Sequence, residues 1–377
     1  MKPVALVAAL LVTTLAAHAE VDDDVEAVLV HYRLYVDAGY LHSSTDPENG
    51  IWRSKSTTFK LDAPEINLGM AMLWKPATAD SRWGFELGVQ AGVDAELALP
   101  DQDAIAGADV LQYIYRASLT YLLPIGNGLS LTGGILPAPP GYESYLSIDN
   151  PTYTRGYVTD FVPYFVIGVE AAYEFSPSVD AAFFVVSGWD YLSDINDVPS
   201  VFGKVVWRWS ERLTFTQTLY WGPDQADTAV EFWRFFSDSI LEYRNGPFTL
   251  AVVLGAGTEK DAEAAGAPRN SWFTTALWFR WNLDDHWSIG VRPEFIDDPD
   301  GVASGSRQRL GDVSVALRYR AHPARNHTLV ASLEYRYDRS SGAEGGFFSG
   351  ANNTLVGEQH LIMIALTWSF TSGFGSP

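Results

Sequence analysis

The sequence predicts an all-β protein: a transmembrane, antiparallel, up-and-down β-barrel of about 16 strands (14–18). Three observations indicate this fold class. Apolar and polar residues alternate over runs of about ten residues, which is the period of a strand and the length that crosses a bilayer. The connections between the runs alternate between short and long, and Trp and Tyr gather beside the short ones. Outer-membrane barrels have short periplasmic turns, long extracellular loops and aromatic girdles.

The N-terminus has the features of a secretory signal peptide. Lys2 precedes the apolar run Val4–Leu11, and Ala17-His18-Ala19 has the small-x-small pattern of a cleavage site. The sequence therefore predicts four segments: a signal peptide (1–19), a short acidic periplasmic N-terminus (20–27), a single transmembrane barrel (28–370) and a C-terminal extension (371–377).

The strand pattern is clearest from Leu111 to Tyr121, where every second residue is apolar or aromatic. The same period recurs in Trp83–Val93 and in Ile362–Phe370. Sixteen runs are predicted, near 28–41, 65–75, 82–94, 109–122, 128–136, 161–175, 178–188, 199–209, 212–221, 231–243, 247–257, 271–283, 286–296, 309–321, 327–338 and 358–370.

The connections divide into two classes. Short turns such as Ser176-Pro177 and Arg244-Asn245-Gly246 are predicted to lie in the periplasm. Long extracellular loops are predicted at 42–64, 95–108, 137–160, 189–198, 222–230, 258–270, 297–308 and 339–357. The predicted periplasmic girdle beside the short turns is Trp74, Trp83, Tyr121, Trp207, Trp209, Tyr243, Trp281, Trp287, Tyr319, Trp368 and Phe370. A soluble all-β sandwich or propeller is the alternative, and it explains neither the strict alternation of turns nor the aromatic end.

Bulk composition excludes other classes. The chain has no cysteine, so disulfides and thiolate metal sites are ruled out. The formal net charge is −21, which opposes binding to nucleic acid. No motif predicts a cofactor or a metal site. The histidines form no recognisable pairing with Ser or Asp, so a barrel lipase or protease is the disfavoured enzyme alternative and we expect no catalysis.

Charged residues within the predicted strands indicate which face of each strand is exposed to water in the lumen. A Lys or Arg facing lipid near the midplane costs roughly 2–4 kcal/mol, so these residues should face the lumen. The predicted pore-wall residues are Glu86, Arg116, Glu170, Lys204, Arg280, Arg292 and Glu294, with Arg318 and Glu334 also facing inward.

Loop 137–160 differs from the other long loops. Prolines such as Pro137 and Pro151 stiffen it, and Tyr145 and Ile148 would avoid water. Irregular backbone is tolerated at membrane depth where it lines a water-filled cavity. We therefore expect the loop to fold inward and constrict the pore, with carboxylates facing Arg292 and Lys204. Its predicted constriction residues are Glu143, Asp149, Arg155 and Asp160.

The middle of the chain resembles a known family. Gly141, Glu143, Asn150, Tyr153 and Arg155, continued by Pro163-Tyr164 and Gly168, resemble the OmpL-like β-barrel porins of bacterial outer membranes. Ser187-Gly188-Trp189-Asp190, with Asp194 and Asn196, extends the resemblance. It implies a diffusion channel, and in general porins the third loop constricts the pore.

The predicted function is an outer-membrane porin of a Gram-negative bacterium, a water-filled channel for passive diffusion of small hydrophilic solutes and ions. A substrate-selective transporter and a structural or adhesive barrel with a closed lumen remain alternatives. Expected partners are outer-membrane lipid and lipopolysaccharide, and the assembly machinery, which would read Trp368-Ser369-Phe370 near the chain end. The sequence leaves monomer and homo-trimer open. Net charge predicts a weak preference for cations.

Overall fold

The computed structural model describes residues 30–97, 108–189, 191–192, 196–262 and 264–374. The predicted signal peptide (1–19) and acidic N-terminus (20–27) lie outside the described residues.

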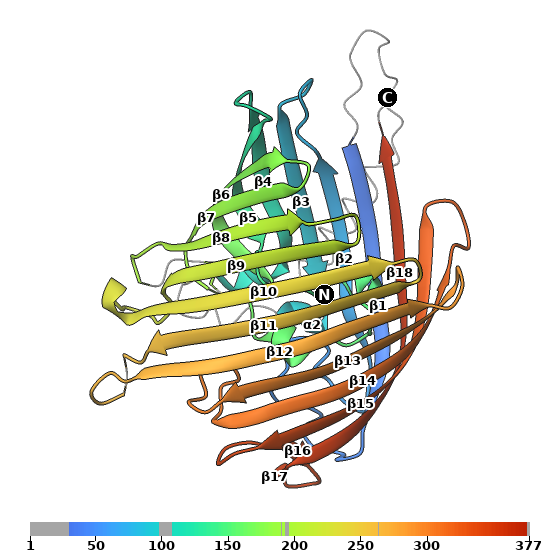
Figure 1. The fold of residues 1–377 in the computed structure, drawn as a ribbon. Coiled ribbons are helices and arrows are strands. Elements are labelled where there is room, and N and C mark those ends of the chain that lie inside the picture. The colour runs from blue at the N-terminus through green and yellow to red at the C-terminus, as the bar shows by residue number, and fades with distance from the viewer. Residues whose placement is uncertain (1–29, 98–107, 190, 193–195, 263, 375–377) are drawn as a thin grey trace.

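In this part of the chain, sixteen antiparallel strands close into one barrel (Figure 1). Each strand pairs with its neighbours in the sequence, and β1 pairs with β18 to close the wall. The barrel strands are β1 (Val30–Ser43), β2 (Pro64–Lys75), β3 (Trp83–Ala91), β4 (Ile114–Leu123), β5 (Leu129–Pro137), β6 (Phe165–Ser176), β7 (Val179–Val186), β8 (Ser200–Arg208), β9 (Leu213–Pro223), β10 (Trp233–Asn245), β11 (Phe248–Lys260), β12 (Arg269–Asn282), β13 (Trp287–Asp298), β14 (Gln308–Ala321), β15 (His327–Ser341) and β18 (Glu358–Phe374).

The remaining elements are short and lie in the long loops. A small hairpin, β16 (Phe347–Ser349) and β17 (Thr354–Val356), precedes β18. The helical turns are α2 (Val93–Leu97), η1 (Ala108–Tyr113), η2 (Ser147–Asp149), α3 (Tyr157–Asp160) and η3 (Val230–Phe232). Among the described residues, every helix is too short or too polar to cross a membrane.

The predicted all-β barrel is confirmed, and several of its strand boundaries are corrected. β4 begins at Ile114, and the alternating residues before it form η1. The antiparallel pairing of β3 with β4 stops at Val89 and Ile114, directly after a register shift at Gly88/Val89, so residues 108–113 are not held in the ladder. β6 begins at Phe165 rather than at 161. β18 passes the predicted end at 370 and pairs Phe374 with Val30.

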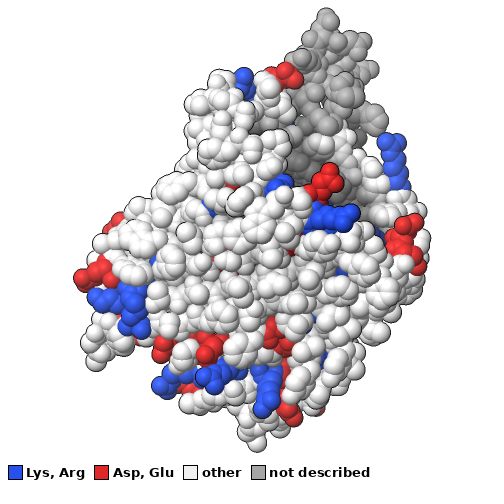
Figure 2. Space-filling view, in the orientation of Figure 1, with Lys and Arg blue, Asp and Glu red and all other residues white. Residues whose placement is uncertain are grey.

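The outer face of the wall is apolar. Along β14, Val313 and Val315 are 46% and 44% exposed, whereas Asp312 and Ser314, which alternate with them, point inward and are buried. Figure 2 shows a largely uncharged band across this view of the barrel, with Lys, Arg, Asp and Glu gathered towards the strand ends. A continuous exposed apolar band is what lipid requires and what a soluble monomer avoids.

The aromatic girdle forms beside the short turns, with one correction. The rings of Trp83 and Tyr121 lie 4.5 Å apart, and those of Trp287 and Tyr319 lie 4.8 Å apart. Trp74 does not belong to this outer girdle. It pairs across the sheet with Glu86 and so shares the lumen face, where it stacks on His31.

Candidate functional site

The irregular segment between β5 and β6, residues 138–164, lies inside the barrel and is called the inward loop here. Pro139, Pro140 and Pro151 lack the N–H that a sheet ladder needs, so the loop cannot extend the wall. Tyr145 and Ile148 are 6% and 1% exposed and pack against inward side chains of the wall. The prolines thus prevent the loop from pairing with the sheet, and burial of its apolar side chains stabilises its position in the lumen.

A buried ion pair joins the inward loop to β13. Arg292 Nη1 lies 2.9 Å from Glu143 Oε1, and both side chains are excluded from water. The same nitrogen donates to the Thr152 hydroxyl, and Arg292 Nη2 lies 3.2 Å from Asp312 of β14. Charges taken out of water need partners of this kind, because their hydration is lost. The structure therefore brings together two residues that the sequence analysis singled out, Glu143 and Arg292.

Two wall carboxylates bind backbone N–H groups of the loop. Glu294 accepts from Tyr157 N at 2.6 Å and from Val158 N at 3.0 Å, which satisfies the first N–H groups of α3. Glu334 of β15 accepts from Tyr153 N at 2.5 Å and from Thr154 N at 3.2 Å. Glu294 and Glu334 face the lumen, as the strand period predicts, but they are covered by the loop and do not line open water.

The loop between β1 and β2, residues 44–63, is called the outer loop here and packs over the inward loop. Lys55 from this outer loop forms an ion pair with Asp160, and Thr57 donates to Asp160 at 2.8 Å. Burial acts to raise the pKa of the Asp160 carboxyl, but the charge of the Lys55 ammonium, hydrogen bonds from Lys55 and Tyr164 and the charge of Arg155 together lower that pKa. Asp160 is therefore a charged anchor beneath a second loop rather than a group exposed to passing ions.

Arg155 is anchored in the same way by Asp94 of α2. The two side chains form an ion pair with no water access, and Thr58 N donates to Asp94 at 2.6 Å. Burial raises the pKa of Asp94 to about 6, against the opposing effect of the Arg155 guanidinium. The predicted constriction residue Arg155 is thus neutralised within the loop layer.

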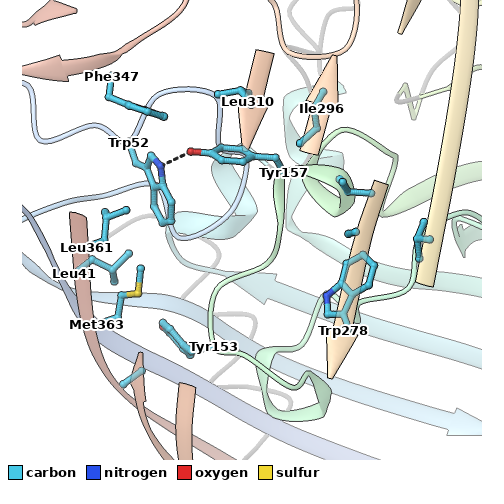
Figure 3. Packing of buried hydrophobic residues seen from close by; sticks show 14 of the residues in the cluster. Leu41, Trp52, Tyr153, Tyr157, Trp278, Ile296, Leu310, Phe347, Leu361 and Met363 are labelled. Atoms are coloured by element: carbon cyan, nitrogen blue, oxygen red, sulfur yellow. Dashed lines mark hydrogen bonds between the residues drawn. The ribbon is translucent and has the colours of Figure 1, made fainter. Parts of the chain in front are cut away.

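Aromatic packing joins the two loops to the wall at the same place. Trp52 of the outer loop donates from Nε1 to the Tyr157 hydroxyl at 3.0 Å, and Figure 3 shows the two rings side by side beneath Phe347. Tyr157 in turn donates to Asp338 at 2.9 Å. The Arg336 guanidinium lies over both rings, 4.6 Å from Trp52 and 4.4 Å from Tyr157. These large rings can be buried because the Trp52 N–H and the Tyr157 O–H both have hydrogen-bond partners.

Asp149 differs from the other three predicted constriction residues. Its side chain is 50% exposed and lies 3.8 Å from Arg33 of β1, on the side of the loop that faces the short turns. Arg280 of β12 donates to the Asp149 carbonyl oxygen at 2.9 Å. Of the four residues predicted for the constriction, Asp149 is the one with an exposed side chain.

The opposite wall, β3 to β8, carries the remaining predicted residues. Arg116 lies 3.7 Å from Glu86. Glu170 and Lys204 line a cavity of about 510 Å³ between β4 and β8. Lys204 does not face a loop carboxylate as expected; its ammonium donates to the Pro139 carbonyl oxygen at 3.1 Å.

Sequence reasoning missed several anchors. Asp312, Arg336 and Asp338 alternate with apolar residues inside predicted strands, so the period used for Arg292 could have found them. Lys55 and Asp94 lie outside the barrel strands, where no period marks the direction of a side chain. In the described residues no group of three or more His, Asp or Glu side chains could hold a metal ion.

The fold is similar to solved outer-membrane channels. An anion-selective porin from Comamonas acidovorans shares 10% identity at a TM-score of 0.55, over 90% of this chain and 99% of that one. The outer membrane channel DcaP of Acinetobacter baumannii shares 11% identity at a TM-score of 0.58, over 94% and 100%. OmpT of Vibrio cholerae shares 12% identity at a TM-score of 0.54, over 93% and 100%.

No curated protein sequence is significantly similar to the chain. The profile of one family, described as "Putative beta-barrel porin-2, OmpL-like", matches residues 30–370. This match spans the whole barrel from the first strand into the last, and it agrees with the resemblance carried by the inward loop. The protein is therefore an outer-membrane β-barrel that belongs to the OmpL-like porin family.

Proposed function

We propose that the protein is a channel for passive diffusion of small hydrophilic solutes and ions, and that the inward loop constricts it. The observation that carries the proposal is the buried Glu143–Arg292 pair, which fixes the loop across the lumen of a barrel wide enough for water. Barrels of 16–18 strands leave an aqueous channel, whereas eight strands are filled by side chains. A loop held by buried ion pairs narrows that channel at a constant position.

Deleting the loop tests the constriction. Residues 141–157 are replaced by a short Gly-Ser link, and single channels are recorded in planar bilayers. Unit conductance should rise clearly and ion selectivity should weaken. A heat-modifiable, correctly assembled barrel with unchanged conductance would show that the loop does not limit flow.

A crosslink supplies the matched control. The Ser147 and Thr367 hydroxyl oxygens lie 3.4 Å apart, one on the inward loop and one on β18, and the chain has no cysteine of its own. A disulfide in Ser147→Cys/Thr367→Cys should leave unit conductance as in the unmodified protein, because it locks the loop where it already lies. A change on oxidation that reverses on reduction would mean that the conducting state has the loop elsewhere.

A second candidate is a substrate-selective channel. Three clusters of buried apolar residues lie against the lumen wall, one of them built around Trp189, Phe202 and Tyr220. Such packing narrows the route and favours selection among solutes. Flux that saturates with one solute would support this reading, linear flux supports general diffusion, and a reconstituted barrel without conductance would indicate a closed structural barrel.

The proposed partners follow from the membrane setting. Lipid and lipopolysaccharide would contact the apolar band, and the assembly machinery would bind the last strand, which ends at Phe374. We include a homo-trimer in the proposal, since the structure of OmpT of Vibrio cholerae has been solved in a trimer form. Crosslinking in native membranes would detect it. The proposed transport involves no catalytic step and no cofactor.

A further inference from the structure

Four arginines gather in the lumen at the short-turn end of the barrel. Arg33 lies near the start of β1, Arg280 near the end of β12, and Arg318 and Arg320 near the end of β14. Arg318 lies within electrostatic range of Arg280 and Arg320, and Arg320 within range of Arg33. They form one group, which we call the arginine cluster, beneath the inward loop.

The cluster binds the loop through neutral acceptors. Arg320 donates to the Ile148 carbonyl oxygen at 2.8 Å, and Arg280 to that of Asp149 at 2.9 Å. Arg318 donates to the carbonyl oxygens of Ser147 and Asn150. Carbonyl oxygens satisfy hydrogen bonds but leave the positive charge in place, and each of these arginines has more donors than the loop uses.

Few carboxylates offset this charge among the described residues. Asp149 lies 3.8 Å from Arg33, so four positive charges face one negative charge, an excess of three. Glu334 acts on Arg318 from farther up the wall, but it is buried and engaged by loop N–H groups and the charges of Arg292 and Arg336. Glu242 lies 2.8 Å from Arg244 and is already paired.

The opposite wall is nearly neutral. Glu86 pairs with Arg116, Asp180 pairs with Arg208, and Glu170 and Lys204 offset each other. Glu174 is the one further acid lining the cavity on that wall. The net charge of −21 therefore does not describe the field inside the lumen. Local charge at the pore wall, rather than the total, decides which ions are attracted.

We propose that the arginine cluster is a binding subsite for small anions that carry carboxylate or phosphate groups, reached from the side of the short turns. This proposal rests on the proposed channel function and names the class of solute that the channel favours. The planar guanidinium fork matches carboxylate and phosphate oxygens, which share a bidentate geometry. An anion on the cluster would complete donors that the loop carbonyls leave free. With this subsite the channel should prefer anions, in place of the weak cation preference that the net charge predicts.

Side-specific block of single channels is the test. The protein is reconstituted with one orientation assigned by loop proteolysis, and succinate or inorganic phosphate is added to each side in turn. Both anions should reduce the current carried by chloride, at a concentration about tenfold lower from the short-turn side than from the loop side. Block by phosphate alone or by succinate alone identifies which oxyanion the subsite takes. No block by either, or equal block from both sides, overturns the proposal.

Variants assign the block to the cluster. Arg280 and Arg320 are half-exposed, and glutamine can still donate to the loop carbonyls, so Arg280→Gln/Arg320→Gln should fold and raise the half-blocking concentration about tenfold or more. Asp149→Asn, which removes the opposing charge, should lower it. Arg208→Gln on the opposite wall is the matched control and should leave it unchanged. Equal effects of the Arg208 variant and the cluster variant would refute the assignment.

Equilibrium binding separates this proposal from the channel function. Calorimetry of inorganic phosphate with the detergent-solubilised protein needs no conduction. Binding that weakens in Arg280→Gln/Arg320→Gln supports the subsite even if no channels appear, in which case the diffusion function fails alone. Conducting channels with neither phosphate binding nor block refute the subsite alone.

Discussion

Glu143 of the inward loop and Arg292 of β13 meet at 2.9 Å with both side chains shielded from water. The inward loop is thereby joined to the barrel wall inside the lumen. The pair is one of several, since Asp160 with Lys55 and Arg155 with Asp94 lie in the same layer. The loop is consequently a packed layer of the protein, and removing single charges from it should have measurable effects.

Replacing Arg292 should cost stability. Arg292→Met leaves Glu143 buried without its partner, and breaking one side of a buried ion pair costs about 3–5 kcal/mol. Urea unfolding in detergent would measure the loss. The double variant Glu143→Gln/Arg292→Met should lose less, because it also removes the buried Glu143 charge that the single variant leaves unpaired. In both variants Asp312 keeps Arg336 at 3.3 Å. Arg307→Met, which breaks an exposed pair with Glu344, is the control and should not shift the unfolding curve. Equal losses in Arg292→Met and the double variant would argue against the pairing.

The Asp94 carboxyl should make stability depend on pH. Its pKa is about 6 when folded and near 3.8 when exposed. Between these values the folded state holds a proton that the unfolded state has released, so this contribution is full below about pH 4 and is lost as pH rises past 6. Relative to Asp94→Asn, the unmodified protein should lose roughly 3 kcal/mol between those limits. Unfolding free energies of both proteins at each pH would measure it, and a difference that stays constant with pH would contradict the shift.

Enlarging Gly290 should displace the loop. Gly290 lies on the lumen face of β13, and a β-carbon there would overlap the Pro151 carbonyl oxygen. Gly290→Ala should therefore leave the barrel assembled, raise unit conductance and speed proteolysis within residues 138–164. Gly203→Ala on the outer face of β8 is the control, because a β-carbon at Gly203 meets no atom within 4 Å and cannot touch the loop. Indistinguishable channels from the two variants would show that the loop can yield without opening the pore.

A charged side chain on the outer face of the wall should destabilise the barrel more than one on the lumen face. Leu254 lies at the middle of β11 and is 48% exposed. Leu254→Arg should cost about 2–4 kcal/mol, because arginine at the bilayer midplane loses its hydration. Thr216→Arg on the lumen face of β9 is the comparison and should cost far less. Unfolding from lipid vesicles would compare them, and similar costs would contradict the assigned inner and outer faces.

Much of the fold could be predicted because the alternation of apolar and polar residues, a property of adjacent positions, indicates a strand. The period of two placed Arg292, Glu294 and Arg318 on the inner face, and the structure has them there. It failed at Leu111 and Tyr113, which alternate correctly but form η1, because the pairing of β3 with β4 stops at Val89 and Ile114 beside a register shift. It also misplaced Trp74, whose position beside a short turn says nothing about which face it occupies.

The sequence by itself determined the barrel, its strand order, and a proline-rich loop that cannot join the sheet. Only the tertiary structure decided which charges cancel. Asp160 meets Lys55 across a separation of 105 residues, and Arg155 meets Asp94 across 61, between segments with no periodic pattern. Alternation is a property of adjacent residues, whereas neutralisation depends on distance in space and on exclusion of water. Because the position of charges in space, and not their sum along the chain, decides the local field, a chain of strongly negative total charge can have an arginine-rich lumen wall.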